Sequence, residues 1–233
     1  MIYITGDTHR NFDRVTTFCD RFNTSKEDVL IILGDVGINF WGEEEDKEVK
    51  KKLSQLPISF FCIHGNHEMR PESIATYKET ERYGGTVYWE PEFPSLLFAK
   101  DGEIYELCGK RCIAIGGAYS VDKNVRIMSG YGWWPDEQPS AEIMNRVTKR
   151  LDFENWNVDF VFTHTCPNNR LSDVFPYRYF DVDRTTEKWL ETIEKRLTYI
   201  KWYCGHFHKN VRIGSMQFLY EDIIMFGARN QGS

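Results

Sequence analysis

Residues 1–9, MIYITGDTH, contain the pattern that decides the fold class of this chain. A short apolar run at residues 2–5 ends at a Gly-Asp pair, and an amphipathic segment with a helical period follows it. Similar apolar runs at residues 29–33 and 58–63 end at Gly-Asp and at His-Gly-Asn, with a charged segment between them. Because parallel strands need a crossover of a dozen or more residues, this alternation predicts βαβ units and an α/β fold.

The rest of the chain predicts a second group of strands and two further helices. Short runs with turn signals between them predict antiparallel strands at residues 86–88, 95–99, 104–107 and 111–115. Toward the C-terminus we expect a helix capped by Ser140, a strand at 158–163, a helix at 186–197 and strands within 199–226. No repeat or linker-like tract interrupts the pattern, so a single domain spanning residues 1–233 is expected.

The composition is typical of a folded, water-soluble protein. Hydrophobic residues make up 41% and charged residues 27%, which argues against disorder, collagen-like repeats and coiled coils. The formal charge of -6 gives no general attraction for nucleic acid. The six cysteines form no CxxC pair, and no run reaches the ~18–20 apolar residues that span a bilayer. We therefore expect free thiols, no secretory leader, no membrane association and a cytoplasmic location.

Metal-ligating residue types follow the predicted strand ends, where open α/β sheets place their sites. The seven candidates are Asp7, His9, Asp35, Asn66, His164, His206 and His208, and a further histidine, His67, follows Asn66. Carboxylate, imidazole and amide ligands without thiolates favour Mn, Fe, Zn or Ni over a structural zinc site. Seven ligands would exceed one tetrahedral shell, so we expect two divalent ions. A carboxylate such as Asp35 could bridge them at the ~3.5–4 Å separation typical of two-metal hydrolytic sites.

Five short motifs resemble the ordered signature of the calcineurin-like metallophosphoesterases. They are Gly6-Asp7-Thr8-His9, Gly34-Asp35, Gly65-Asn66-His67-Glu68, Thr163-His164 and Gly205-His206-Phe207-His208. Each motif alone is weak, but five in the family's order at predicted strand ends are specific. The resemblance covers residues 6–208 and implies two mixed β-sheets packed face to face with flanking helices, a four-layer α/β/β/α sandwich.

The resemblance also implies a role for each motif residue. One metal ion would be held by Asp7, His9 and His208, the other by Asn66, His164 and His206, with Asp35 as the bridge; manganese is favoured for both ions. His67 would be the catalytic histidine that binds no metal and stands beside the scissile bond. There an imidazole with a pKa near 6.5 can protonate a leaving oxygen, while the ions activate water and offset phosphate charge.

The sequence departs from the protein serine/threonine phosphatases of this family. In that branch a carboxylate that orients the catalytic histidine and an arginine that grips phosphate follow the Gly-Asp pair, whereas Gly34-Asp35 continues here as VGINF. The partner that orients His67 is therefore unidentified. Other residues could contact phosphate: Arg10, Arg70, Arg126 and His64. For His64, a hydrogen-bonded place in the core is favoured over that role.

Several further features have two interpretations. Trp133 and Trp134 lie in a Gly- and Pro-rich stretch and could stack on a nucleobase, although packing of the loop onto the sheet is slightly favoured. The acidic run at residues 43–48 is typical of a solvated helix start, and Glu68 of a structural hydrogen-bond acceptor. Residues 175–180 could shape the substrate pocket or an oligomer contact.

These observations predict a hydrolase of phosphate esters, and a phosphodiesterase acting on a nucleotide or other small ester is the first choice. A phosphomonoesterase, including a protein phosphatase, is the runner-up because the phosphatase-specific residues are missing. A nuclease is not favoured, since the chain shows neither a basic pattern nor an obvious extra domain for a polymer. The non-enzyme alternative is a metal-free interaction scaffold. Oligomeric state is left open by the sequence.

Overall fold

The computed structural model describes residues 1–174 and 182–227, whose strands form two mixed β-sheets. The first sheet has seven strands in the order β13-β1-β2-β3-β6-β5-β4. They are β1 (Ile2–Thr5), β2 (Val29–Ile32), β3 (Ser59–Cys62), β4 (Lys78–Arg82), β5 (Gly85–Trp89), β6 (Leu96–Ala99) and β13 (Ile224–Met225). The first three pair in parallel, and β5 pairs with β6 antiparallel, as the sequence predicted. Strand β4, which the sequence analysis did not predict, extends the antiparallel part.

The second sheet has six strands in the order β11-β12-β10-β9-β8-β7. They are β7 (Ile104–Leu107), β8 (Lys110–Ile115), β9 (Phe160–Thr163), β10 (Lys201–Cys204), β11 (Val211–Ile213) and β12 (Met216–Phe218). Strands β8, β9 and β10 are parallel neighbours, and β7 forms an antiparallel hairpin with β8. The central strands of each sheet are therefore parallel, and their carboxyl ends lie at the same end of the sheet.

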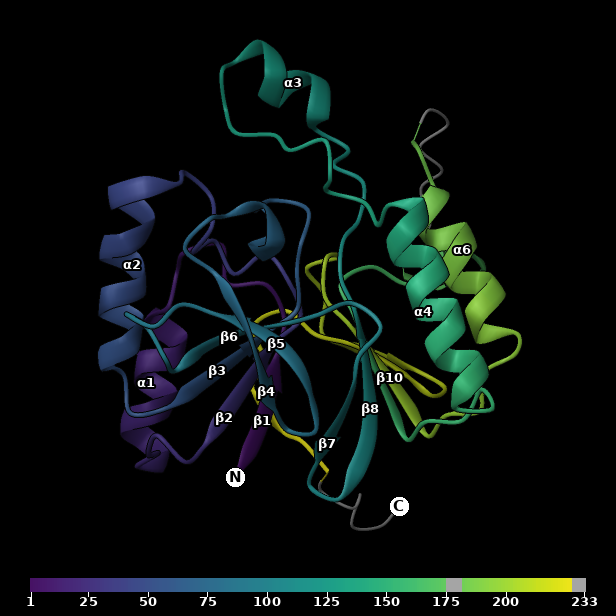
Figure 1. The fold of residues 1–233 in the computed structure, drawn as a ribbon, viewed down its shortest axis with the longest axis horizontal. Coiled ribbons are helices and arrows are strands. Elements are labelled where there is room, and N and C mark those ends of the chain that lie inside the picture. Colours follow the sequence, from purple (N-terminus) through teal and green to yellow (C-terminus); the bar gives the residue numbers. More distant parts are fainter. Residues whose placement is uncertain (175–181, 228–233) are drawn as a thin grey trace.

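Helices cover the outer faces of both sheets (Figure 1). Their bounds are α1 (Asp13–Phe22), α2 (Glu43–Gln55), α3 (Lys123–Met128), α4 (Ala141–Phe153), α5 (Leu171–Val174) and α6 (Thr185–Glu194), with short 3₁₀ turns η1 (Pro71–Ser73) and η2 (Asn168–Arg170). Helices α1 and α2 lie outside the first sheet, and α4 and α6 lie outside the second. The predicted four-layer sandwich is confirmed. The Ser140 hydroxyl accepts the Ile143 backbone N–H at 3.2 Å and so caps α4 as expected.

Alternation along the short strands builds the core between these layers. Ile4 and Ile31 belong to the apolar cluster between the two sheets, together with Phe162 of the second sheet. Their neighbours Tyr3 and Leu30 belong to the cluster under α1 and α2. Because both faces of β1 and β2 are buried, these strands are apolar throughout, as parallel strands covered on both faces usually are.

The acidic run at the start of α2 is not uniformly solvated. Asp46 is only 2% exposed, and its carboxylate accepts the backbone N–H groups of Trp41 and Gly42 at 2.9 and 2.6 Å. It also forms an ion pair with Arg10 at 2.6 Å. The expectation of a solvated helix start was therefore wrong at Asp46, because this side chain caps the turn that leads into the helix.

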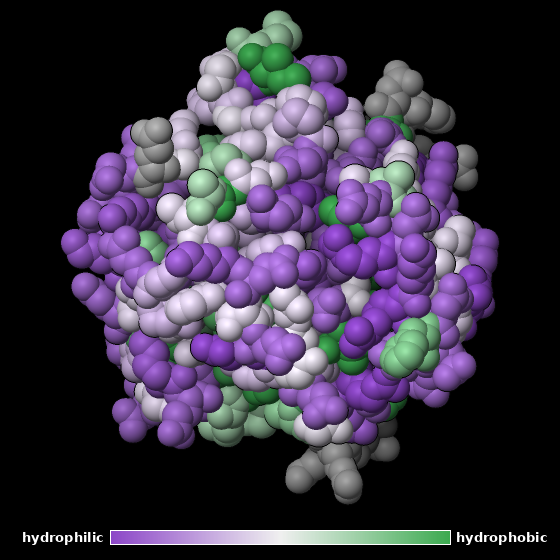
Figure 2. Space-filling view, in the orientation of Figure 1, coloured by the Kyte–Doolittle hydropathy of each residue, from purple (hydrophilic) through white to green (hydrophobic). Residues whose placement is uncertain are grey.

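The segment between β8 and α4 carries a short helix that the sequence analysis did not predict. Helix α3 stands apart from the sandwich at one end of the molecule (Figure 1). Its tip exposes apolar side chains on a face that is otherwise largely hydrophilic (Figure 2), including Val125 at 63% and Met128 at 87% exposure. Few tertiary contacts hold this projecting segment, residues 121–134, which is called the α3 arm below. It therefore belongs to the less stable parts of the fold.

Two expectations from composition concern the chain as a whole. All six cysteines are free thiols, and Cys108 is the exposed one. In the part of the chain that the structure describes, no helix combines the length and apolar character that crossing a bilayer requires. The segment at 175–180, considered for a pocket or an oligomer contact, lies outside the described residues.

Candidate metal centre

The sequence-predicted ligands meet where strands of both sheets end. Asp7 and His9 follow β1, Asp35 follows β2, and Asn66 and His67 follow β3. From the second sheet, His164 follows β9, and His206 and His208 follow β10. The ring of His164 crosses to the first sheet, where Nδ1 donates to the Leu33 carbonyl at 2.7 Å. The two sheets are thus joined directly at the site.

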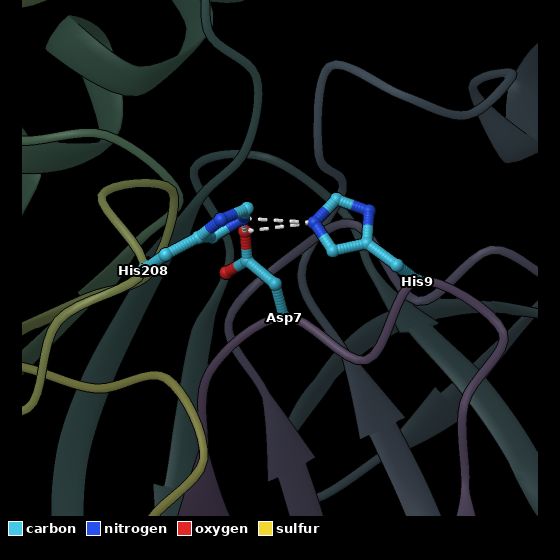
Figure 3. A group of neighbouring side chains, drawn as sticks. All are labelled: Asp7, His9 and His208. Carbon is cyan, nitrogen blue, oxygen red and sulfur yellow. Dashed lines mark hydrogen bonds and ion pairs between the residues drawn. The ribbon is translucent and has the colours of Figure 1, made fainter.

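One group consists of Asp7, His9 and His208 (Figure 3). One ligand atom from each residue lies within 4.8 Å of the others. The Nε2 atoms of His9 and His208 are 2.9 Å apart, and the nearer carboxylate oxygen of Asp7 is 3.3 Å from His208 Nε2. The two imidazoles are open to solvent, with side-chain exposures of 36% and 48%. This group therefore forms the outer half of the site.

A second group consists of Asp7, Asp35 and His164, all buried. The Nε2 atom of His164 is 3.5 Å from Asp35 Oδ2 and 2.8 Å from Asn66 Oδ1. The Asn66 amide is oriented by Ser120, since its Nδ2 donates to the Ser120 hydroxyl at 2.9 Å. Because Nδ1 of His164 donates to the backbone, its Nε2 atom is the one that faces the carboxylates, as second-shell bonds of metal ligands usually arrange.

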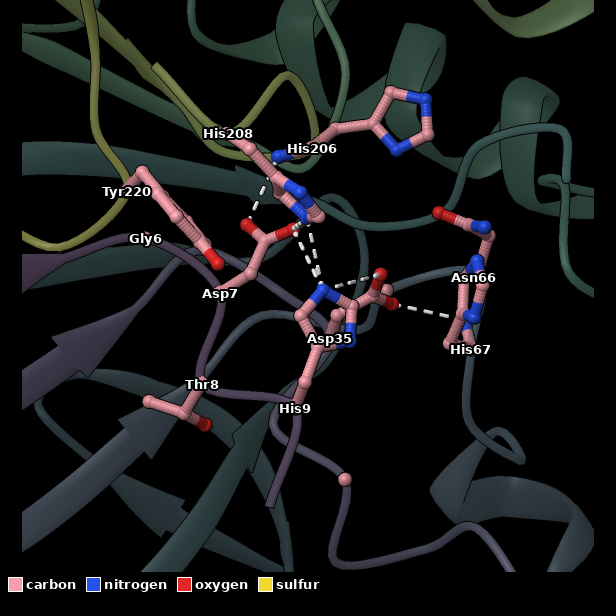
Figure 4. A network of polar contacts seen from close by, with 12 residues as sticks. Gly6, Asp7, Thr8, His9, Asp35, Asn66, His67, His206, His208 and Tyr220 are labelled. Atoms are coloured by element: carbon pink, nitrogen blue, oxygen red, sulfur yellow. Dashed lines mark hydrogen bonds and ion pairs between the residues drawn. The ribbon is translucent and has the colours of Figure 1, made fainter. Parts of the chain in front are cut away.

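Backbone N–H groups hold both carboxylates in place. Asp35 Oδ1 accepts the His67 N–H at 2.8 Å, and Asp7 Oδ1 accepts the His206 N–H at 2.9 Å (Figure 4). In each case the second oxygen, Oδ2, faces the imidazoles. In each carboxylate, one oxygen is fixed by a backbone hydrogen bond and the other is available to bind a metal ion.

The tight turns need glycine at two positions. Gly34 has a φ of +99°, and a Cβ atom there would lie 2.1 Å from Nδ1 of His164. A Cβ at Gly65 would lie 2.0 Å from Oδ1 of Asp35. Contacts this short do not occur, so the side chains could reach one another only with glycine at both positions. The Gly-Asp and Gly-Asn pairs of the sequence are explained by this close packing.

The electrostatics describe a site with excess negative charge. Burial alone would raise the pKa of Asp7 and Asp35, but the neighbouring His164 holds both below their usual range. Burial alone would lower the pKa of His164, whereas Asp35 and Asp7 raise it to about 9. The proton that His164 keeps compensates two buried carboxylates, and a bound cation could take over that compensation.

The donor set fits divalent transition-metal ions. Asp7 Oδ2 is a buried carboxylate oxygen with no hydrogen bond to any described residue. A buried anionic oxygen without a hydrogen bond is costly, and a metal ion would satisfy it. The converging carboxylate and imidazole atoms are those that Mn, Fe, Zn and Ni prefer.

His206 lies beside these two groups but belongs to neither. Its ring centroid is 4.9 Å from that of His164, in an edge-to-face arrangement. Desolvation and the nearby His164 lower the pKa of His206 to about 3, so its ring is neutral and keeps a free lone pair. Its predicted role as a metal ligand stays a prediction.

His67 stands at the mouth of the site, next to the α3 arm. Its ring lies edge-to-face with that of His9, with centroids 5.7 Å apart. Arg126 contacts its Nδ1 atom, and Asp122 Oδ1 lies 3.8 Å from its Nε2 atom. Burial lowers the pKa of His67, and the Arg126 charge acts in the same direction while Asp35 opposes it.

The other candidates for phosphate contact are engaged elsewhere. The Arg10 guanidinium turns to Asp46 at 2.6 Å, and the buried Arg70 donates to Asp101 at 2.6 Å. His64 is buried, with its Nε2 atom 3.1 Å from the Glu68 carbonyl. Substrate contact by these three residues stays a prediction, and each would first have to leave its present partner.

The tryptophans contact residues of the segment that bears α3 and Phe40, which lies between β2 and α2. Trp134 lies edge-to-face on Phe40 with ring centroids 5.3 Å apart. Trp133 donates from Nε1 to Glu137 at 2.9 Å, and the Lys123 ammonium lies 4.0 Å from its ring centroid. Both are half-buried. These partners lie in loops and at the start of α3, so packing onto the sheet and nucleobase stacking both stay predictions.

Sequence reasoning missed two residues that support the outer half of the site. The Tyr220 ring stacks on His208 with centroids 4.5 Å apart and an interplanar angle of 18° (Figure 4). Arg14 Nη2 donates to the carbonyls of Asp7 at 2.7 Å and Tyr220 at 2.9 Å. Neither residue belongs to a motif, and their proximity comes from pairing of the C-terminal segment beside β1.

Glu68 is a structural acceptor in the inner wall of the site. Its carboxylate oxygens accept the N–H groups of Val36 at 3.3 Å, Gly37 at 3.2 Å and Gly65 at 3.1 Å. Burial raises its pKa to about 7. These bonds tie the loop after β2 to the loop after β3, where two of the candidate ligands reside.

Comparisons with known proteins agree with this geometry. The sequence model described as calcineurin-like phosphoesterase matches residues 1–210. No curated protein matches the chain in sequence. One solved structure covers 94% of this chain and 88% of its own length at 12% identity, with a TM-score of 0.50, which supports the fold.

Two other solved structures are less similar in shape. A protein of unknown function from Aquifex aeolicus has 16% identity and a TM-score of 0.35, with 86% of this chain and 88% of that chain covered. A proposed 5′-nucleotidase from Staphylococcus aureus, in complex with alpha-ketoglutarate, has 12% identity and a TM-score of 0.41. That match covers 94% of this chain but 48% of the other, so this chain spans about half of it.

Proposed function

The chain belongs to the calcineurin-like phosphoesterases, a family that hydrolyses phosphate esters, and we propose that it is a metal-dependent phosphodiesterase acting on a nucleotide or other small ester. The observation that carries the proposal is the convergence of Asp7, His9, Asp35, His164 and His208 around a buried carboxylate oxygen that lacks a hydrogen bond. We further propose that the enzyme acts as a single domain in the cytoplasm.

We assign the ligands as the two groups suggest. Asp7, His9 and His208 would hold one divalent ion, Asn66, His164 and His206 a second, and Asp35 would contact both. Manganese is our first choice among Mn, Fe, Zn and Ni. When bound, such ions supply an activated water for in-line attack and offset the charge of the phosphate.

The residues of the chain then bind the ester and serve its leaving group. His67 stands at the mouth of the site with 24% of its side chain exposed, so a phosphate ester bound there can reach its ring. We assign His67 to the leaving oxygen, through its Nε2 atom. The buried inner ligands exclude water from the far side of the site, which strengthens electrostatic interactions with the phosphate.

A diester fits the charges near His67 better than a monoester does. Arg126 is the cation that contacts the His67 ring, and the Asp122 carboxylate lies 3.8 Å from its Nε2 atom. The Asp122 carboxylate would repel a monoester dianion more strongly than a singly charged diester. This argument, and the missing phosphatase-specific residues, support the diester.

The deciding experiment compares bis(p-nitrophenyl) phosphate with p-nitrophenyl phosphate. Metal-stripped protein is reconstituted with Mn²⁺, Ni²⁺ or Zn²⁺, and His67→Ala serves as the catalytic control. We expect metal-dependent turnover of the diester that His67→Ala reduces by about 100-fold or more. Preference for the monoester would replace the proposal with a phosphomonoesterase. A protein that binds no stoichiometric metal would be a scaffold instead.

The nucleotide part of the proposal has its own test. Stacking on a base contributes ~1–3 kcal/mol, so Trp133→Ala should raise KM for a nucleotide diester by about 5-fold or more. KM for bis(p-nitrophenyl) phosphate should change little in the same variant. Equal changes for both substrates would show that Trp133 only packs the loop.

A further inference from the structure

The partner of the catalytic histidine is supplied by the α3 arm. His67 Nδ1 is in contact with Nη1 of Arg126, a residue 59 positions further along the chain. Arginine has only N–H donors and stays protonated in proteins, so the Nδ1 atom must be the acceptor of this hydrogen bond. The single proton of the neutral His67 ring is then on Nε2.

The Arg126 guanidinium has three further partners around this contact. Its Nε atom donates to the Gly132 carbonyl at 2.9 Å, and the guanidinium carbon lies 5.4 Å from the ring centroid of Phe40. Asp122, one helical turn earlier on the same arm, is 3.6 Å from Nη1. The residue is only 8% exposed although it lies on the most projecting helix of the molecule.

Among the residues that the structure describes, none forms a hydrogen bond with the Nε2 atom of His67. Asp122 Oδ1 is 3.8 Å from Nε2, which exceeds the ~2.7–3.2 Å of an N–H···O hydrogen bond. An oxygen of a bound ester could therefore accept a hydrogen bond from Nε2–H without displacing a described residue. The α3 arm thus contacts the Nδ1 atom of the ring and leaves the Nε2 atom for substrate.

We propose that Arg126 is the positioning residue of His67: it fixes the ring orientation and the Nε2–H tautomer, so that His67 donates a hydrogen bond from Nε2 to the leaving oxygen of the ester. The inference rests on the proposed function for the identity of the acceptor, but the contact itself does not depend on it. Arginine here takes the place of the orienting carboxylate that the Gly34-Asp35 segment lacks, and it makes the α3 arm part of the reaction site.

A spectroscopic test is independent of activity. Long-range ¹H–¹⁵N correlation spectra of the protein reconstituted with diamagnetic Zn²⁺ report which nitrogen of His67 carries the proton, and His67→Asn identifies the signals. We expect unprotonated Nδ1 and protonated Nε2 in the wild type, and a mixture of tautomers in Arg126→Met. A wild-type ring protonated on Nδ1 would overturn the proposal.

A kinetic test uses a double-mutant cycle with bis(p-nitrophenyl) phosphate and a diester that has a poorer leaving group. A misplaced catalytic group commonly costs about 100-fold, so we expect kcat of Arg126→Met to fall by 10- to 100-fold, more for the poorer leaving group. If Arg126 acts through His67, the double variant Arg126→Met/His67→Asn is no slower than His67→Asn alone. Losses that multiply in the double variant, or a change in KM alone, would show that Arg126 acts independently of His67.

The controls separate positioning from folding. Arg150→Met removes the same charge from α4, where Arg150 pairs with Glu154 at 3.1 Å, and should leave kcat unchanged. In Arg126→Ala, guanidinium ion at millimolar concentration should restore part of kcat, which a structural defect would not allow. Wild-type protein that cleaves neither ester would contradict the proposed function, whereas the tautomer spectrum would still decide the role of Arg126.

Discussion

The inner and outer halves of the candidate metal centre are built differently from the same residue types. Asp7, Asp35 and His164 are at most 2% exposed and are fixed by backbone donors and a backbone acceptor. His9 and His208 are one-third to one-half exposed, and their Nε2 atoms face each other 2.9 Å apart. The inner half is therefore prearranged by the fold, whereas the outer half depends on a few supporting side chains.

This contrast has a consequence for metal binding. A prearranged ligand set loses little conformational entropy when an ion binds, whereas exposed imidazoles must be ordered. We expect the inner half to bind its ion more tightly and to release it more slowly.

The largest effect is expected at Asp35, which adjoins both halves. Replacing it by asparagine removes a ligand charge while keeping the shape, so Asp35→Asn should lower diester turnover on the order of 1,000-fold, about 4 kcal/mol in the barrier. Metal content, measured by atomic emission after dialysis, should fall below that of the wild type. Asp20→Asn on the exposed face of α1 is the matched control and should change neither quantity. An active Asp35→Asn enzyme would remove the bridging role.

A second prediction compares histidines from the two halves in metal-free protein. His164→Ala leaves a cavity and an unpaired Leu33 carbonyl in a buried place, so it should destabilise the fold by about 3 kcal/mol. His208→Ala removes an exposed ring and should cost less than about 1 kcal/mol. Urea unfolding with EDTA present measures both. Equal losses would show that the two halves do not differ in rigidity.

The third prediction concerns the pH dependence of the inner wall. Burial raises the pKa of Glu68 to about 7, above the value of 4.5 expected in an unfolded chain. Between pH 4.5 and about pH 7, the folded state therefore keeps a proton on Glu68 that the unfolded chain has lost. The contribution of this group to stability is fully present below pH 4.5 and is lost as the pH rises through about 7.

Glu68→Gln should remove this dependence. In metal-free protein, the free energy of unfolding of the wild type should fall relative to that of Glu68→Gln by about 2.5 kcal/mol between pH 5 and pH 8. The absolute stability of the variant can differ, because the amide replaces an acceptor of three N–H groups; only the difference in slope matters. Parallel stability curves would mean that Glu68 is ionised throughout this range.

The smallest effect is expected at Tyr220, which supports the outer half. Residues behind metal ligands typically contribute 10- to 100-fold to metal affinity. Tyr220→Ala should weaken the outer ion by about 10-fold and leave the inner ion unchanged, whereas Tyr220→Phe keeps the stacked ring and should bind as the wild type does. Competition with a chromophoric chelator measures both affinities. Weakening of the inner ion instead would invert the comparison.

The positions of the strand ends were predictable because local sequence controls them. Short apolar runs that stop at Gly-Asp or His-Gly-Asn predicted β1, β2 and β3, and the order of the motifs predicted which ends would meet. The glycines of the motifs could also be noted from the sequence. The structure gives their reason, because only a missing Cβ lets Gly34 approach His164. The motif residues that the structure brings together lie at these strand ends, but the second group found, Asp7, Asp35 and His164, differs from the expected set of Asn66, His164 and His206.

The supporting residues could not be predicted, because their contacts depend on segments far apart in the chain. Arg126 was one of several arginines considered for phosphate contact, and nothing in its neighbourhood indicates that it reaches His67 across 59 positions. Asp46 looked like one acid among several in a solvated run, yet the fold buries it against Arg10. Tyr220 lies outside every motif, and only the topology of the C-terminal strands places it on His208.

The family match ends at residue 210, but both sheets are completed by residues beyond it. Strand β13 pairs with β1 along Tyr3 and Ile4, and β12 pairs with β10. In a chain shortened to residue 210, β1 and β10 would become unprotected edge strands rich in apolar residues. Such edges can pair with strands of another molecule. Strands β12 and β13 therefore cover these two strand edges, apart from anything they do for the chemistry.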